Sequence, residues 1–93
     1  FMRSNLPVVI GELGNGGEKA SNAVVTIRKA QAAAAAYPDF KGRVVFVKTT
    51  AFARPAEESP NKGHGHHWYG NAESYYLIGD ALGKAMLKLI SKD

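Results

Sequence analysis

Apolar and polar positions divide the chain into two short apolar runs and two stretches with helical spacing. Residues 6–13 and 43–48 are rich in β-branched side chains and show almost no alternation with polar residues. This pattern is typical of strands covered on both faces, as in a parallel sheet. We therefore predict two buried parallel strands at these positions.

Apolar residues elsewhere recur every three or four positions, which predicts two helices. The first helix covers residues 21–37, with Ser21 or Asn22 as its N-cap. Its apolar stripe comprises Ala23, Ile27, Ala30, Ala34 and Tyr37. The second helix covers residues 72–91, with Asn71 as its N-cap. Its apolar stripe comprises Tyr75, Ile78, Leu82, Ala85, Met86 and Leu89. The order strand, helix, strand, loop, helix predicts an α/β fold with one βαβ unit.

The predicted loop 51–70 contains three histidines and the only tryptophan. Long loops inside compact domains usually have a function. One histidine would suit acid–base chemistry, since an imidazole can both take and give a proton near neutral pH. His64, His66 and His67 together are also a possible metal site, or a surface cluster without a role. Trp68, Tyr69, Tyr75 and Tyr76 could form a platform on which a sugar stacks, although we expect Tyr75 and Tyr76 to belong to the core.

Glu12 is the only charged residue in the first apolar run, and it lies near the carboxyl end of that run. Ligands of open parallel sheets bind outside the carboxyl ends of the strands. The carboxylate could orient a histidine or bind a substrate hydroxyl. It could equally be a strand-end residue that caps a nearby helix or meets solvent.

Composition narrows the classes of function. The 93 residues allow one domain at most, and the absence of cysteine excludes disulfides and thiol catalysis. The net charge of +4 comes from scattered Lys and Arg, so we expect no nucleic-acid partner. No apolar run approaches the ~20 residues of a membrane span, so we expect no membrane partner. The glycine-rich segment 11–17 matches neither nucleotide fingerprint, and we expect no cofactor. The sequence does not indicate a compartment.

Segments 6–13, 27–31, 44–50 and 67–79 together resemble the sialate O-acetylesterase-like domain, a carbohydrate acetylesterase group of the SGNH hydrolases. The resemblance implies a flavodoxin-like three-layer α/β/α fold. It also implies a serine nucleophile in an early G-D-S block, which this chain lacks. The family's catalytic histidine precedes the last helix and corresponds to His67. The family often has Asp three positions earlier, where this chain has His64, so Glu12 is the candidate replacement.

We therefore expect residues 1–93 to be the C-terminal fragment of a single esterase domain, without the part that carries the nucleophile. It would help remove O-acetyl groups from sugars, with His67 and Glu12 catalytic and Trp68 and Tyr69 binding substrate. The expected partners are an O-acetylated carbohydrate and either the missing N-terminal part or a second copy, because two strands make no self-sufficient sheet. The chain alone should be inactive. The alternative is a non-catalytic binding domain whose His-rich loop holds a metal.

Overall fold

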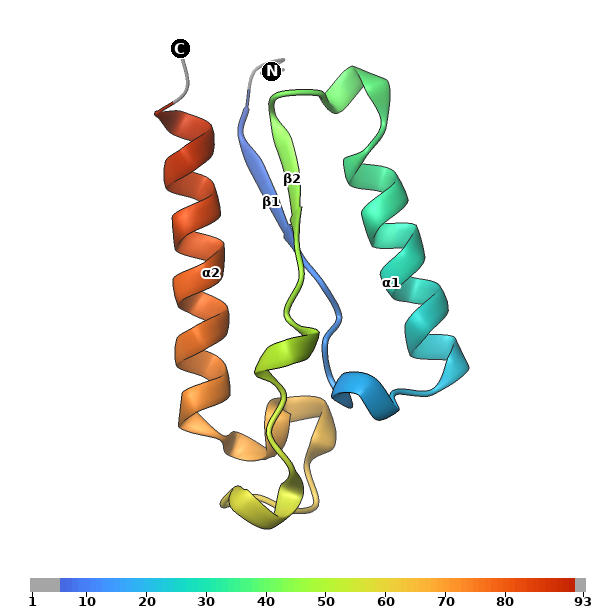
Figure 1. Ribbon diagram of the computed structural model, residues 1–93, viewed down its shortest axis with the longest axis vertical. Helices are drawn as coiled ribbons and strands as arrows, with labels where there is room; N and C mark the ends of the chain where they lie inside the picture. Colours follow the sequence, from blue (N-terminus) through green and yellow to red (C-terminus); the bar gives the residue numbers. More distant parts are fainter. Residues whose placement is uncertain (1–5, 92–93) are drawn as a thin grey trace.

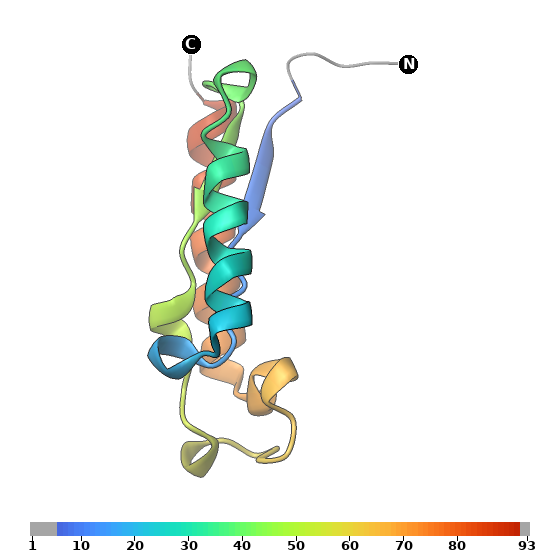
Figure 2. The ribbon, with the colours of Figure 1, turned by 90° about the vertical axis from the view of Figure 1, so that its right-hand side faces the viewer.

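The computed structural model describes residues 6–91, and it has the predicted α/β architecture (Figure 1). The regular elements are β1 (Val8–Gly11), α1 (Asn22–Ala35), β2 (Val44–Val47) and α2 (Ala72–Ile90). Short 3₁₀ turns connect them. The two helices lie on opposite faces of the two-stranded sheet, as the two perpendicular views show (Figures 1 and 2). The described part of the chain is therefore a small α/β/α arrangement.

The two strands are adjacent and parallel, as predicted. The prediction that they are buried is wrong, because every described strand residue is half-buried or exposed. Paired positions run from Val8 with Val44 to Gly11 with Val47. The ladder is closed by hydrogen bonds from the Val8 N–H to the Arg43 carbonyl (2.8 Å) and from the Glu12 N–H to the Val47 carbonyl (2.9 Å). Both strands are shorter than predicted, because regular pairing stops at the loops that follow them.

The predicted apolar stripe of α1 is wrong, because a different face of the helix meets the sheet. Ile27 is 47% exposed and Tyr37 is 59% exposed, and the alanines of the stripe are exposed as well. The half-buried positions are Val24, Val25, Arg28, Gln31, Ala32 and Ala35. The polar side chains of Arg28 and Gln31 set this orientation, since they hydrogen-bond to the backbone at the end of β1 and in the loop after it. The predicted cap is present: the Ser21 hydroxyl accepts from the Val24 N–H (3.4 Å).

The sheet-facing side of α2 follows the predicted stripe from Ile78 onward. Leu82 packs so closely against β1 that a methyl group at Gly11 would lie 3.3 Å from its Cδ2. Tyr75 and Tyr76 are exposed, so our assignment of these rings to the core is wrong. The exposed side of the helix carries an ion pair between Lys84 and Asp80 (2.9 Å).

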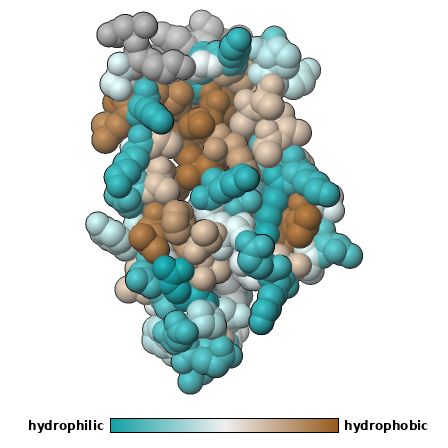
Figure 3. Space-filling view, in the orientation of Figure 1, coloured by the Kyte–Doolittle hydropathy of each residue, from teal (hydrophilic) through white to brown (hydrophobic). Residues whose placement is uncertain are grey.

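The described residues contain no fully buried hydrophobic side chain. Their buried side chains are instead polar: Thr49, Ser59, Asn71 and Ser74. Apolar atoms remain visible at the surface between the two helices (Figure 3). No helix within residues 6–91 is long and apolar enough to cross a membrane.

Candidate functional site

Chemistry-bearing residues gather at the carboxyl edge of the sheet, where both strands run into loops (Figure 1). The loop after β2 is not structureless: it forms 3₁₀ turns at Thr50–Phe52, Ala56–Glu58 and Gly65–Gly70. The Asn15 side chain joins the loop after β1 to this segment, because its Nδ2 donates to the Gly65 carbonyl (3.1 Å). The two loops therefore share one edge, as the βαβ unit predicts.

A buried polar network fixes the long loop to the start of α2. Asn71 caps this helix through a bond from the Ser74 N–H to its Oδ1 (3.1 Å), and its Nδ2 donates to the Ser59 hydroxyl (3.0 Å). The Ser59 hydroxyl donates to the Pro55 carbonyl (2.8 Å), and the Ser74 hydroxyl donates to the Phe52 carbonyl (2.7 Å). These bonds satisfy the buried side chains and tie two loop turns to one helix end.

Glu12 closes the turn that follows β2. Its Oε1 accepts from the Thr49 N–H (2.8 Å), the Thr50 N–H (2.9 Å) and the Thr50 hydroxyl (2.6 Å). Its own carbonyl accepts from the Thr49 hydroxyl (2.9 Å). Partial burial is the largest single influence on this carboxyl and opposes ionisation. The bonds from Thr50 and Thr49, with the positive charge of Arg28, together hold the pKa of Glu12 below its ordinary value. Glu12 thus acts as an ionised cap for the loop.

The expected hydrogen bond between Glu12 and His67 is not present in the described structure. The glutamate is directed to Thr49 and Thr50, and the His67 side chain is exposed. His67 is held by its backbone, since its carbonyl accepts from the Tyr75 hydroxyl (2.6 Å) and its N–H donates to the His64 carbonyl (3.0 Å). Within residues 6–91 its ring has no hydrogen-bond partner, neither Glu12 nor a backbone carbonyl. Direct support of His67 by Glu12 is therefore not seen within residues 6–91, where the carboxylate binds Thr49 and Thr50 instead.

The three histidines lie close to one another at the surface. Ring centroids are 4.2 Å apart for His66 and His67, 5.8 Å for His64 and His66, and 6.3 Å for His64 and His67. In the part of the chain that the structure describes, no group of three His, Cys, Asp or Glu side chains is placed to hold a metal ion.

The backbone next to His67 is strained. Trp68 and Tyr69 both have a φ of 54°, and Gly70 follows with a φ of 66°. The left-handed conformation costs a side-chain-bearing residue roughly 1–2 kcal/mol. The turn places the Trp68 indole over the loop after β1, where a methyl group at Gly14 would lie 2.7 Å from its Cη2. Strain of this kind concentrates at functional sites.

A pocket of about 450 Å³ opens beside this turn. Its walls come from the loops after both strands, and they are formed by Gly16, Gly17, Glu18, Lys19, Ala53, Arg54, Pro55, Ala56, Glu57, Gly65, Trp68 and Tyr69. The volume lies within the usual range for small-molecule sites. Both predicted substrate-binding residues line it, whereas no histidine does. Arg54 is fixed at the wall by its ion pair with Glu73 (2.6 Å).

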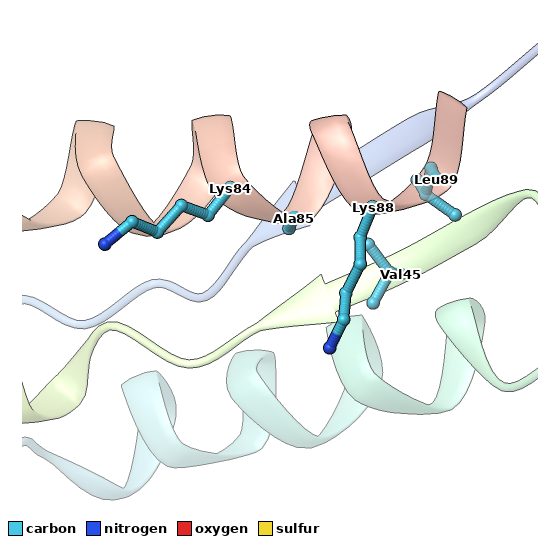
Figure 4. Close-up of a pocket in the computed structure, with 5 residues that line it drawn as sticks. All are labelled: Val45, Lys84, Ala85, Lys88 and Leu89. Carbon is cyan, nitrogen blue, oxygen red and sulfur yellow. The ribbon is translucent and has the colours of Figure 1, made fainter. Parts of the chain in front are cut away.

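A larger cavity of about 710 Å³ lies far from this edge, along the outer side of β2 (Figure 4). It is lined by Val45, Lys84, Ala85, Lys88 and Leu89. These residues offer an apolar floor and two ammonium groups, with neither an acid–base pair nor a nucleophile. We therefore assign the candidate site to the smaller pocket.

None of the serines in residues 6–91 is placed as a nucleophile. Ser21 caps α1, and Ser59 and Ser74 are buried in the polar network. Ser91 ends α2, at the opposite end of the molecule from the candidate site. Ser4 lies outside the described residues.

Sequence reasoning missed two residues that shape the site. Gly14 is buried, and a methyl group there would lie 2.2 Å from the Thr49 Oγ1. Arg54 supplies the charged wall of the pocket. The glycine-rich run after the first strand was the available signal for Gly14, but its spacing indicates only a turn.

Comparisons with known proteins add no relative: the chain matches no protein-family model, no curated protein and no solved structure. The fold and the site geometry therefore define an α/β unit with a candidate ligand pocket at its carboxyl edge.

Proposed function

We propose that this chain is the histidine-bearing C-terminal part of an SGNH-type serine carbohydrate esterase that removes O-acetyl groups from sugars. The observation that carries the proposal is the pocket at the carboxyl edge of the parallel strands. Trp68 and Tyr69 lie in its wall, and His67 directly precedes them in the same strained turn. Helices on both faces of the parallel sheet fit the flavodoxin-like fold that this class of enzyme implies.

The lining of the pocket suits a neutral, hydroxyl-rich ligand. Aromatic rings bury the apolar faces of a sugar while its hydroxyls bond to polar neighbours. Lys19, Glu57 and Arg54 line the same pocket and supply donors and acceptors. A ligand of this size would lie beside the turn that carries His67.

His67 has the freedom that a general base needs. Its exposed ring has no protein hydrogen bond within the described residues, so either nitrogen is free to meet an incoming serine hydroxyl. In the proposed reaction, His67 takes the proton of a serine supplied from outside the described residues as that serine attacks the acetyl carbonyl. The protonated ring then donates to the leaving sugar oxygen.

Glu12 has a changed role in this proposal. It does not orient His67 but holds Thr49 and Thr50, the turn through which the chain enters the loop carrying the histidine. The acid that would support His67 comes from elsewhere, or the serine and histidine act as a dyad.

Ligand binding is the direct test with the chain as it exists. We would titrate the chain with an O-acetylated monosaccharide and follow the fluorescence of Trp68, the only tryptophan. Tyr69→Ala should weaken binding about tenfold, as expected for loss of one stacking ring. Tyr76→Ala is the matched control, because Tyr76 is exposed on α2 and does not line the pocket. Equal affinities for all three proteins would contradict the site.

Catalysis needs a second assay. The chain alone should not cleave a chromogenic acetyl ester, because no described serine is placed as a nucleophile. In a complete enzyme that joins this chain to a G-D-S segment, His67→Ala should lower kcat by several orders of magnitude. His64→Ala should leave kcat almost unchanged. Sugar binding without turnover in that complete enzyme would favour the non-catalytic binding domain, and equal losses at both histidines would favour a metal site.

A further inference from the structure

Within residues 6–91, the outer edge of β1 is an unusual surface because it is apolar, uncharged and paired with no other strand. Residues 6–11 contain no charged side chain, and Val8 is 37% exposed. In the ladder, Val8 and Glu12 bond to β2, so the backbone groups of Val9 and Gly11 point to the opposite side. This edge therefore presents Pro7 C=O, Val9 N–H, Val9 C=O and Gly11 N–H.

The edge is closed just beyond these groups by Gln31. Its Nε2 donates to the Gly11 carbonyl (3.1 Å), and its Oε1 accepts from the Leu13 N–H (2.8 Å). A neighbouring parallel strand would make this same pair of bonds, so the amide replaces one residue of such a strand. Arg28 covers the next segment, since its Nε donates to the Leu13 carbonyl (2.6 Å). In the described part of β1 and the loop after it, this leaves the stretch from Pro7 to Gly11 for pairing.

We propose that, in this chain by itself, without further strands of a complete enzyme, the stretch pairs with β1 of a second copy, in antiparallel orientation about a two-fold axis at Val9. The two Val9 residues then exchange both of their hydrogen bonds. Each Gly11 N–H donates to Pro7 C=O of the other copy, which gives four bonds in all. Proline lacks an N–H, so the Gly11 carbonyl opposite it would have no donor from the second copy. Gln31 already supplies that donor, and the edge is therefore self-complementary.

The outer edge of β2 does not offer the same surface. Lys84 and Lys88 from α2 flank the cavity along this edge (Figure 4), and the strand is bracketed by Arg43 and Lys48. Two copies meeting here would bring these cations together, and lysines at a sheet edge discourage pairing. Because cations flank the edge of β2 and no charged side chain lies on the edge of β1, we assign the dimer contact to β1.

The apolar stripe of α1, which is exposed in the single chain, would cover the joined β1 strands in the dimer. Ile27 and Ala34 lie four residues before and three residues after Gln31, so they share the side of the helix that reaches the outer edge of β1. This explains why an apolar stripe faces away from β2. In the dimer the two stripes face one another over the paired β1 strands, and Val8 of each copy lies beneath them.

The first test compares two proline substitutions. Val9→Pro removes an N–H that points to the joining edge, whereas Val44→Pro removes an outward N–H at the edge of β2. We would measure mass by light scattering from about 1 to about 500 μM protein. The unsubstituted chain and Val44→Pro should dimerise. Val9→Pro should dimerise about thirtyfold more weakly, because two hydrogen bonds per dimer are lost. A monomeric unsubstituted chain, or dissociation by Val44→Pro alone, would overturn the proposal.

The second test does not depend on how proline is tolerated. The chain has no cysteine, so single substitutions give unambiguous cross-links. The two Val9 positions of a hydrogen-bonded antiparallel pair are about 5.5 Å apart between Cα atoms, within disulfide range. Under mild oxidation Val9→Cys should form a covalent dimer, and Val44→Cys should stay monomeric on a denaturing gel. Cross-linking of Val44→Cys without that of Val9→Cys would assign the contact to β2 and refute the β1 interface.

Discussion

Replacing Glu12 with glutamine tests whether this residue holds the fold. Three donors converge on its Oε1 at 2.6–2.9 Å. Bonds to a charged acceptor contribute about 1.5–3 kcal/mol each and neutral bonds about 0.5–1.5 kcal/mol. The site is only partly buried, and the glutamine oxygen can still accept. We therefore expect Glu12→Gln to lower the free energy of unfolding at pH 7 by about 1–2 kcal/mol.

The effect must depend on pH with a defined sign. The pKa of Glu12 in the folded chain lies below its ordinary value of 4.5, so unfolding takes up a proton. Its contribution is fully present above that ordinary value and is lost as the pH falls through the lower folded-state pKa. The stability difference between the unsubstituted chain and Glu12→Gln should therefore shrink between pH 6 and pH 3.

Urea unfolding followed by Trp68 fluorescence measures this difference, because the indole packs over Gly14 beside Thr49. Glu57→Gln is the control, since Glu57 is exposed and forms no hydrogen bond through its side chain within residues 6–91. Equal stability of Glu12→Gln and the unsubstituted chain at pH 7, or a difference that does not change with pH, would refute the capping role. Unchanged stability combined with lost turnover in a complete enzyme would restore the catalytic assignment.

Three further substitutions test the packing around the site. Gly14→Ala should lower the urea midpoint sharply, because its methyl group has no space, whereas Gly63→Ala, with open space around it, should change little. Asn71→Ala removes the cap of α2 and its bonds to the loop, and should cost about 1–2 kcal/mol in the same assay. Tyr75→Phe removes the hydroxyl that holds the His67 carbonyl. It should cost about 1 kcal/mol and speed amide exchange in the 3₁₀ turn, as seen by NMR.

The sequence predicts the regular elements well because their signals are local. The two β-branched runs became β1 and β2, and Asn71 and Ser21 are the caps they were expected to be. Apolar periodicity predicted the wrong buried face of α1, because hydrogen bonds from polar side chains orient this helix. Gln31 has to reach the backbone after β1, and this contact between distant segments has no local signal.

The candidate site was predictable in position and less so in detail. The rule that ligands bind at carboxyl ends of parallel strands brought Glu12 and the histidine loop to one edge. It could not assign the partner of the carboxylate, since Thr49 and Thr50 compete with His67 through two backbone N–H groups and one hydroxyl. Nor does any sequence pattern predict a left-handed turn at two bulky aromatic residues such as Trp68 and Tyr69.

The polar interior of the described residues has a calorimetric consequence. The heat capacity of unfolding rises with the apolar surface that becomes exposed, and it falls with the polar surface. When an ordinary domain unfolds, its heat capacity rises by about 12–15 cal/mol/K per residue. Within residues 6–91 the buried side chains are those of Thr49, Ser59, Asn71 and Ser74, while the apolar side chains of both strands are at most half-buried. The rise in heat capacity per residue should therefore be smaller than in an ordinary domain. The stability of the chain should then change only gradually with temperature, with a broad, flat maximum in place of a steep dome.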